Sequence, residues 1–373
     1  MGKINVAIIG VGNCSSSLVQ GIQKYSEIQD NEIKVPGLMN NILGGYSIGD
    51  VNVVAAFDVD KDKVGKDLSE AIFTKNNNAL KFHDVAKTGV TVERGMTHDG
   101  VGEYLADIIE IDKDKDSVGS ETSDIIQILR DKKVDVVINY LPVGSEQATK
   151  WYVEQVLAAG CAFVNCIPVF IAREDYWQKR FKDKGLPIVG DDIKSQVGAT
   201  IVHRVLTRLF NDRGCKISRT YQLNTGGNTD FLNMIEKSRL KYKKISKTES
   251  VQSQLDVPLD PKEIHIGPSD YVPWQKDNKV AFIRIEGEGF GGAPINLEMR
   301  LSVQDSPNSA GVVIDAIRCV ALARERGLAG PLNSASSYYM KTPPVQHRDH
   351  IARDLTNEFI RGENIKANKS TIN

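Results

Sequence analysis

The chain has 373 residues, more than one hydrophobic core usually organises, so we expect two domains. Hydrophobic residues make up 41% and charged residues 25%, which excludes a disordered or collagen-like polymer. The 47 Lys and Arg residues nearly balance the 48 Asp and Glu residues, so no global positive field holds the protein on nucleic acid or an anionic membrane. Any anion that it binds must therefore be held by a local cluster of charge.

The first half of the sequence alternates between predicted strands and helices. Residues 4–9 and 51–57 are nearly continuous apolar runs, which is typical of parallel strands buried on both faces. Further strands are predicted at 134–139, 162–165 and 187–190, with helices at 146–159 and 176–184. This alternation predicts an α/β fold with a doubly wound, Rossmann-like parallel sheet. Residues 29–49 interrupt it with a Gly- and Asn-rich insertion, where we expect a surface hairpin or lid.

The pattern changes after Asp192. A helix is predicted over residues 199–210, followed by segments with apolar residues at every second position. These segments are residues 219–223, 280–286 and 295–303. The alternation predicts a second, more open α+β domain with one wet face on its sheet.

Helical spacing returns at residues 309–326, and we expect this helix to pack back on the first domain. The NAD-binding domain is therefore predicted to be discontinuous, with residues 1–198 and 306–373. Residues 199–305 form the predicted catalytic and tetramerisation domain. The first residues lack the apolar stretch of a signal peptide, and no segment suits a bilayer span, so we expect a soluble, cytoplasmic protein.

A glycine turn follows the first strand and directly precedes a helix. Gly10 and Gly12 suit a dinucleotide pyrophosphate, because glycines let it approach the backbone N–H groups of a helix N-terminus. The third glycine of the G-x-G-x-x-G pattern is Ser15 here. Asp58 closes the second strand and is the candidate for the adenosine ribose. These features predict NAD rather than NADP; the alternative is an ordinary tight turn.

A run of cationic residues marks a second candidate site. Residues 237–247 hold six Lys and Arg side chains. Such a run is usually a solvated helix face, and its single aromatic residue argues against nucleic acid. Lys243 and Lys247 are spaced i, i+4, so a helix would place both ammonium groups on one face. The Gly- and Asn-rich loop 224–230 lies just upstream, and together they indicate a site for a phosphorylated polyol.

Six motifs follow one another over nearly the whole chain: residues 10–17, 190–195, 224–230, 243–247, 277–281 and 337–341. In order and context they resemble the motifs of the inositol-3-phosphate synthase family, in its short archaeal and bacterial form. The resemblance implies an intramolecular lyase, or isomerase, that converts D-glucose 6-phosphate to 1D-myo-inositol 3-phosphate with tightly held NAD. It also implies a homotetramer, formed through the sheet of the second domain.

The implied reaction is redox-neutral. C5 is oxidised to a ketone, C6 forms an enolate that attacks the C1 aldehyde, and C5 is then reduced again. These steps need an acid/base at the C5 hydroxyl, a cation beside the enolate, a donor at O1 and a clamp on the phosphate. Lysines suit all these tasks, because closely packed ammonium groups lower one another's pKa towards neutrality.

The resemblance also assigns residues to these tasks. The implied catalytic residues are Lys243, Lys279, Lys341 and Asp192, with Lys243 and Lys341 as proton-transfer and oxyanion groups and Asp192 as an orienting carboxylate. The implied substrate-binding residues are Lys247, Ser195, Asn228, Thr229 and Asp230. The implied cofactor-binding residues are Gly10, Gly12, Asn13, Cys14, Asp58, Asn139, Asp191 and Asp305.

Metal binding and two rival functions complete the sequence-based picture. The five cysteines are scattered and the six histidines form no evident site, so we expect neither disulfides nor a zinc site. Some family members depend on a divalent ion, and the sequence leaves open a divalent or monovalent cation beside Asp230.

The rival functions are an NAD-dependent dehydrogenase of the amino-acid biosynthesis type, which would release NADH, and a non-catalytic NAD-sensing protein.

Overall fold

The computed structural model describes residues 2–112 and 120–363. In this part of the chain, seven strands form a parallel sheet in the order β11-β6-β5-β4-β1-β2-β3. The strands are β1 (Ile4–Ile9), β2 (Val51–Asp58), β3 (Val92–Arg94), β4 (Val136–Asn139), β5 (Ala162–Asn165), β6 (Pro187–Val189) and β11 (Gly330–Pro331). The predicted doubly wound parallel sheet is confirmed, although the short strands β3 and β11 were not foreseen.

Helices cover both faces of this sheet. They are α1 (Asn13–Lys24), α2 (Leu68–Ala71), α3 (Glu103–Ala106), α4 (Ser120–Asp131), α5 (Glu146–Ala159), α6 (Asp175–Asp183), α10 (Pro307–Glu325), α11 (Asn333–Tyr339) and α12 (Asp349–Arg361). Val6 and Ile8 of β1 pack in the core with α1 and α10, whereas Ala7 and Ile9 face α4, α5 and α6. Burial on both sides explains why the strand sequences are continuously apolar.

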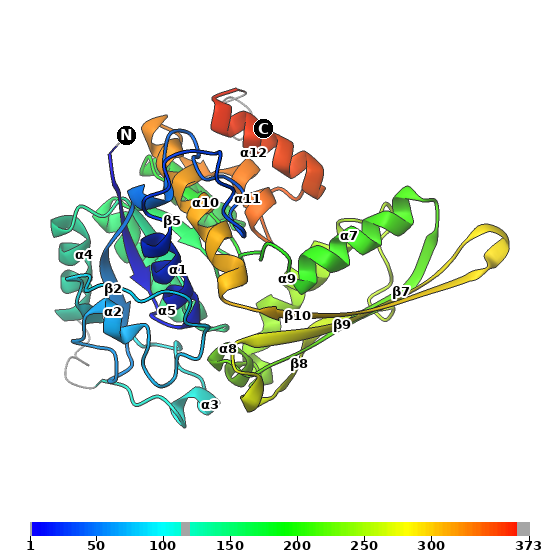
Figure 1. Cartoon of the computed structure of the whole chain (residues 1–373), viewed down its shortest axis with the longest axis horizontal. Helices are drawn as coiled ribbons and strands as arrows, with labels where there is room; N and C mark the ends of the chain where they lie inside the picture. The colour runs from blue at the N-terminus through cyan, green and yellow to red at the C-terminus, as the bar shows by residue number, and fades with distance from the viewer. Residues whose placement is uncertain (1, 113–119, 364–373) are drawn as a thin grey trace.

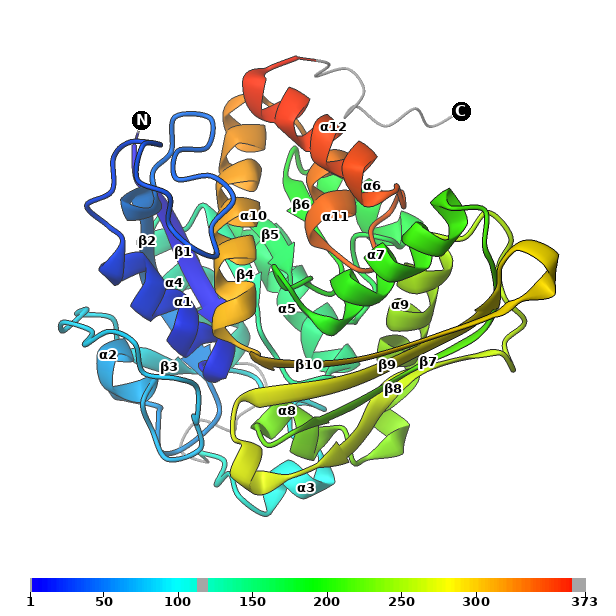
Figure 2. The same cartoon turned by 45° about the vertical axis from the view of Figure 1, so that its right-hand side comes forward.

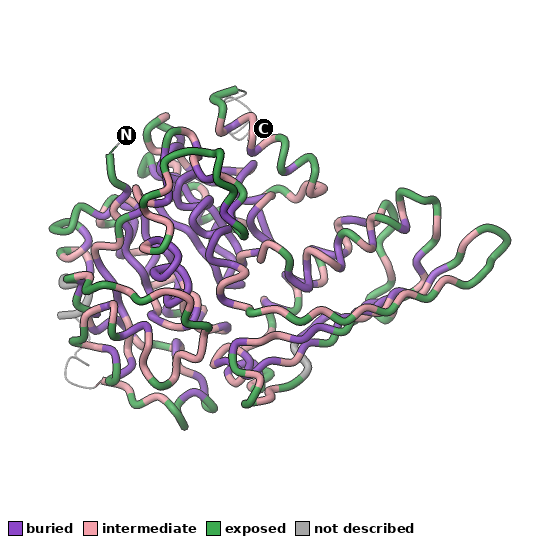
Figure 3. Tube along the Cα trace, in the orientation of Figure 1, coloured by how far each residue is buried: buried purple, intermediate pink, exposed green. Residues whose placement is uncertain are grey.

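A second sheet has the order β10-β9-β7-β8. Its strands are β7 (Lys216–Gly226), β8 (Ile264–Tyr271), β9 (Asn278–Glu288) and β10 (Pro294–Gln304). The helices α7 (Ala199–Asp212) and α9 (Lys241–Gln252) lie on one side of it, as Figures 1 and 2 show. Ile283 and Ile285 are buried on that side, whereas Phe282 is 43% exposed, so the predicted alternation is confirmed. The turn that joins β9 to β10 is exposed (Figure 3).

The chain returns to the first sheet after β10. Helix α10 contacts α1, β5 and β6, which is the packing expected for residues 309–326. The short helix α8 (Thr229–Asn233) and the 3-10 turn η2 (Lys237–Leu240) join β7 to α9. The exact domain boundaries stay a prediction. No helix in the described residues is long and apolar enough to cross a membrane.

The insertion at residues 29–49 lies along α10. The expected hairpin is reduced to one bridge between Leu43 and Tyr46. Arg318, which is fully buried in α10, donates hydrogen bonds to the carbonyl groups of Asn41 and Tyr46 at 2.7 and 3.1 Å. These contacts hold the insertion to the helix. Because the buried guanidinium group donates to its carbonyl groups, the insertion needs few backbone hydrogen bonds of its own.

Candidate active site

A cavity lies between the carboxyl ends of the parallel strands and the second sheet. Its lining includes most of the residues singled out in the sequence: Gly10, Gly12, Asn13, Cys14, Asp58, Asp192, Ser195, Asn228, Thr229, Asp230, Lys243, Lys279, Asp305 and Lys341. This is where ligands bind in open α/β sheets, because loops diverge at the carboxyl edge of the strands.

The glycine turn has the geometry that a dinucleotide requires. Gly10 has a φ of 90°, and a Cβ atom there would lie 2.7 Å from the carbonyl oxygen of Tyr140. A Cβ atom at Gly12 would meet nothing within 4 Å, so open space adjoins the N-terminus of α1. No side chain caps that terminus, which leaves its N–H groups for an anion. These residues fit NAD.

Ser15, which replaces the usual third glycine, is accommodated within the turn. It is fully buried, and its hydroxyl group donates a hydrogen bond of 2.5 Å to the carbonyl oxygen of Gly10. The hydroxyl group therefore stabilises the glycine turn.

Asp58 joins the second strand to the glycine turn. Its Oδ2 accepts a hydrogen bond of 2.7 Å from the N–H of Val11, and its Oδ1 accepts from the N–H groups of Val59 and Asp60 at 2.7 and 2.9 Å. The carboxylate is thus fixed at the end of the cavity where the adenosine ribose is expected.

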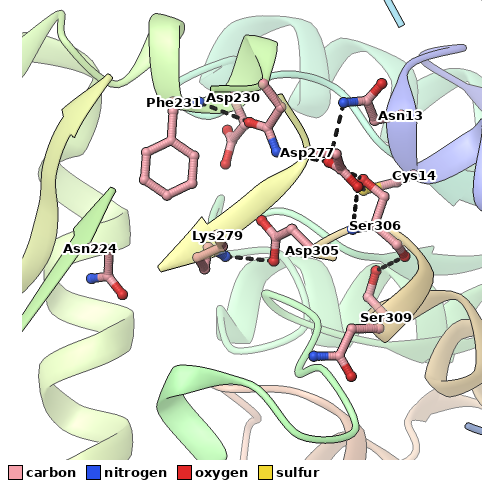
Figure 4. A network of polar contacts seen from close by, with 12 residues as sticks. Asn13, Cys14, Asn224, Asp230, Phe231, Asp277, Lys279, Asp305, Ser306 and Ser309 are labelled. Carbon is pink, nitrogen blue, oxygen red and sulfur yellow. Dashed lines mark hydrogen bonds and ion pairs between the residues drawn. The ribbon is translucent and has the colours of Figure 1, made fainter. Parts of the chain in front are cut away.

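A carboxylate that we did not predict as a site residue connects three elements of the site. Asp277 accepts hydrogen bonds from Asn13 of α1, Asn228 before α8, and both the N–H and the hydroxyl group of Ser306 before α10, at 2.8 to 3.2 Å (Figure 4). Burial raises the pKa of Asp277 to about 6, and the neighbouring Asp305 adds to this shift. Asp277 belongs to the motif 277–281, but sequence reasoning assigned a role there only to Lys279.

Lys279 and Asp305 face each other across adjacent strand ends. The Lys279 Nζ lies 2.6 Å from the Asp305 Oδ1, and 5.6 Å from the centre of the Phe231 ring (Figure 4). This ion pair places one positive and one negative side chain beside the glycine turn, at the end of the cavity nearest Cys14 and Ser306.

Helix α9 brings two lysines to the site, as the i, i+4 spacing predicted. Lys243 and Lys247 are both buried, whereas Lys244 between them is exposed. The Lys243 Nζ lies 2.8 Å from the Asp230 Oδ2. The solvated-face interpretation therefore holds for Lys244 but not for the two lysines on the buried face.

Lys243, Lys247, Lys279 and Lys341, here called the lysine cluster, affect one another electrostatically. Burial lowers the pKa of Lys247 well below its usual value, and the charges of Lys243, Lys279 and Lys341 lower it further. Burial also disfavours the charged form of Lys243, but Asp230 and Asp192 outweigh this effect and raise its pKa. The cluster therefore contains one lysine whose charged form is favoured by its surroundings and one whose charged form is disfavoured.

Asp192 is held between two partners. Its Oδ1 lies 2.8 Å from the Lys341 Nζ, and its Oδ2 accepts a hydrogen bond of 2.7 Å from the hydroxyl group of Ser246. Ser246 is fully buried on the same face of α9 as Lys243. Sequence reasoning missed Ser246, although its position three residues after Lys243 could have suggested it.

Three of the residues assigned to the site do not line the cavity. Lys247 is buried on α9 without lining the cavity, and the other two belong to a buried polar chain. Asn139 donates to Asn165 at 3.0 Å, and Asn165 donates to Asp191 at 2.7 Å. Asp191 directly precedes Asp192, so this chain supports the backbone beside the site. Contact of Asn139 or Asp191 with a cofactor stays a prediction.

The structure gives no support for a metal site. Within residues 2–112 and 120–363, no three His, Cys, Asp or Glu side chains are grouped so that they could hold an ion. Asp230, which was considered beside a cation, pairs with Lys243 instead.

Comparison with known proteins identifies the family. A family model described as myo-inositol-1-phosphate synthase matches residues 198–306. Inositol-3-phosphate synthase of Mycolicibacterium smegmatis is 55% identical over 365 residues, which cover 97% of this chain and 99% of the relative. The chain belongs to the inositol-3-phosphate synthase family. The resemblance inferred from the six motifs is thereby confirmed.

Other members agree with this assignment. Inositol-3-phosphate synthase of Corynebacterium glutamicum is 52% identical over 96% of this chain and 98% of its own length. Among solved structures, a myo-inositol-1-phosphate synthase-related protein from Thermotoga maritima has a TM-score of 0.82 at 24% identity, covering 96% of this chain and 98% of that one. At that identity the structural likeness shows the fold alone, and the inositol-3-phosphate synthase assignment rests on the sequence relatives.

Proposed function

We propose that the protein is an inositol-3-phosphate synthase that converts D-glucose 6-phosphate to 1D-myo-inositol 3-phosphate. The observation that carries the proposal is that three members of the lysine cluster, Lys243, Lys279 and Lys341, line one cavity together with a dinucleotide-type glycine turn. A simple dehydrogenase needs one acid/base beside its nicotinamide, whereas a phosphorylated substrate that passes through an enolate needs several cations. The relatives that cover nearly the whole chain support the same conclusion.

NAD, when bound, would accept a hydride from C5 of the sugar and later return it. Gly10, Gly12 and the N-terminus of α1 would hold its pyrophosphate, and Asp58 would hold the adenosine ribose. Asp305 would lie near the nicotinamide. Because Lys279 pairs with Asp305, the carboxylate proposed to lie near the nicotinamide would also fix the position of the Lys279 ammonium group.

We assign proton transfer at C5 and charge stabilisation to two ion pairs. Lys243 would take the proton of the C5 hydroxyl group as its own proton passes to Asp230, 2.8 Å away, and both transfers would reverse when C5 is reduced. Lys341, held by Asp192, would donate to the oxygen atoms that become negative during enolisation and ring closure. Each carboxylate fixes the direction of its lysine, so the donors are in place before charge develops.

The phosphate would be held by the remaining cations. Lys279 and Ser195, which line the cavity, would contact the phosphate, with Lys247 acting on it through its charge, and Asn228 and Thr229 would contact hydroxyl groups of the substrate. A phosphate dianion near Lys247 would raise its depressed pKa and favour its charged form. Substrate binding would then neutralise the repulsion within the lysine cluster.

We further propose a homotetramer assembled through the second sheet. Within the described residues β10 pairs only with β9, so its other edge has no partner strand. Phe282 and Leu223 form a cross-strand pair and are 43% and 37% exposed. An exposed edge and an apolar pair suit contact with another copy of the chain. Analytical ultracentrifugation tests this assembly, and a monomer at micromolar concentration would contradict it.

One assay tests the proposed reaction. The protein is incubated with glucose 6-phosphate and NAD, and both periodate-sensitive phosphate and absorbance of NADH are followed. The proposal requires product without net NADH. NADH that accumulates in proportion to substrate consumed would instead establish a dehydrogenase. Binding of NAD with no conversion of any sugar phosphate would favour an NAD-sensing protein.

A further inference from the structure

A buried lysine lies between two carboxylates near the adenosine end of the cavity. The Lys63 Nζ is 3.6 Å from the Asp58 Oδ2 and 3.6 Å from the Asp60 Oδ2. Lys63 is 4% exposed and Asp60 is 2% exposed. Lys63 and Asp58 line the cavity, whereas Asp60 lies behind them. A lysine is seldom buried to this extent unless it is paired.

The turn that carries these residues is held in a defined conformation. The Asp60 Oδ1 accepts a hydrogen bond of 3.0 Å from the N–H of Asp62, and the Asp60 carbonyl oxygen accepts one of 2.9 Å from the N–H of Lys63. Asp60 also forms a β-bridge with Ile111. Among the described residues no hydrogen-bond donor reaches the Asp60 Oδ2, so Lys63 is the cation that balances this oxygen.

The charges of this group bear on the choice between NAD and NADP. NADP differs from NAD by a phosphate on the adenosine ribose, and sites that accept it supply a cation at that position. Lys63 is such a cation beside Asp58, but two carboxylates outweigh its single positive charge. The three groups together carry a formal charge of −1, which repels an additional phosphate.

We propose that Asp60 is a specificity-determining residue: by neutralising Lys63 from behind, it keeps a latent 2′-phosphate site inactive and so favours NAD over NADP. Asp58 contributes by occupying the place of the phosphate, but Asp60 decides whether the charge of Lys63 is available. This inference rests on the proposed dinucleotide site and adds a residue that the ligand itself does not touch.

The test compares dissociation constants for NAD and NADP, measured by isothermal titration calorimetry on the full chain freed of cofactor. In Asp60→Asn we expect affinity for NADP to rise about tenfold, since one like charge is removed close to the phosphate. Affinity for NAD should change by less than about threefold, because Asp60 does not line the cavity. Asp62→Asn is the matched control, since Asp62 is an exposed carboxylate on the same turn.

A second substitution shows whether Lys63 is the source of the gain. The double variant Asp60→Asn with Lys63→Met should lose the added affinity for NADP. The inference is overturned if Asp60→Asn leaves the NADP constant unchanged in a folded protein, or if the gain persists without Lys63. Asp60→Ser, whose hydroxyl group can still accept from Asp62, serves if the Asn variant does not fold. Failure of the unaltered protein to bind either dinucleotide would instead refute the proposed function.

Discussion

Lys341 and Asp192 form an ion pair of 2.8 Å although 149 residues separate them in the chain. Their backbones are also paired, because the N–H of Lys341 donates to the carbonyl oxygen of Asp192 at 2.7 Å. Asp192 has a φ of 64°, a conformation that is uncommon for residues with side chains. The return of the chain through α10 and α11 therefore places Lys341 against a fixed carboxylate at the edge of the first sheet.

The two adjacent lysines of α9 provide a matched pair of substitutions. Lys243→Met should lower kcat by at least about a hundredfold, because it removes the proposed acid/base. Lys244→Met should leave kcat within about twofold, since Lys244 is exposed. Both variants should still bind NAD in a fluorescence titration. Equal effects of the two substitutions would refute the assignment of Lys243.

The hydroxyl group of Ser246 should influence the pH dependence of turnover. Burial alone would raise the pKa of Asp192, but Lys341, Lys243 and the Ser246 hydroxyl group hold it below its usual value. Ser246→Ala removes one of these contacts, so the pKa of Asp192 should rise and its charge should be lost at a higher pH. We expect the acid limb of the kcat/KM profile to move towards neutral pH. An unchanged profile, matching the exposed control Ser238→Ala, would contradict this role.

Arg239, in the 3-10 turn η2, contacts the loops over the cofactor end of the cavity. Its Nε donates to the carbonyl oxygen of Val143 at 2.9 Å, and its guanidinium group also donates to that of Asp99 at 2.7 Å. Arg239→Ala removes both contacts and should speed dissociation of NAD about tenfold or more, measured by stopped-flow fluorescence. The exposed neighbour Lys237→Ala is the control, and equal rates in the two variants would contradict the role.

Asp67 gives a prediction about stability alone. Asp67 caps α2 and accepts hydrogen bonds from Ser69 and Thr88. Burial alone would raise its pKa, but these hydrogen bonds outweigh burial and hold the pKa well below the usual range. Asp67→Ala should therefore cost about 1–2 kcal/mol of unfolding free energy at pH 7. Because the folded-state pKa lies below the unfolded value of about 3.9, this difference should shrink as the pH falls below that value. A pH-independent difference in urea titrations would argue against the ionised cap.

The elements that could be predicted from the sequence are those with a strong local pattern. The runs at β1 and β5 and the helix α5 appear with the expected bounds, because continuous apolar strands and amphipathic spacing are local properties. The parallel strand β8 was missed, since its pairing with β7 depends on a segment more than thirty residues away in the chain and its own sequence is interrupted by Gly267 and Pro268. Helix α12 was missed as well, although its apolar residues have helical spacing.

The site was predictable only in part, for a related reason. The glycine turn and the pair Lys243 and Lys247 follow from spacing within one element, whereas Lys341 was found through family resemblance alone. Asp277 and Ser246 act by hydrogen bonds to other elements; helical spacing could place Ser246 on the face of Lys243, but it could not show the contact with Asp192. Buried polar residues that hold a site together are therefore the ones that sequence reasoning overlooks.

The central claim is that C5 is oxidised and then reduced again within one turnover. It is tested most directly with glucose 6-phosphate that carries deuterium at C5, incubated with unlabelled NAD and analysed by mass spectrometry and NMR. The account predicts inositol phosphate that keeps the deuterium on the carbon derived from C5. Product without deuterium at that carbon, or deuterium released in reduced cofactor, would contradict it.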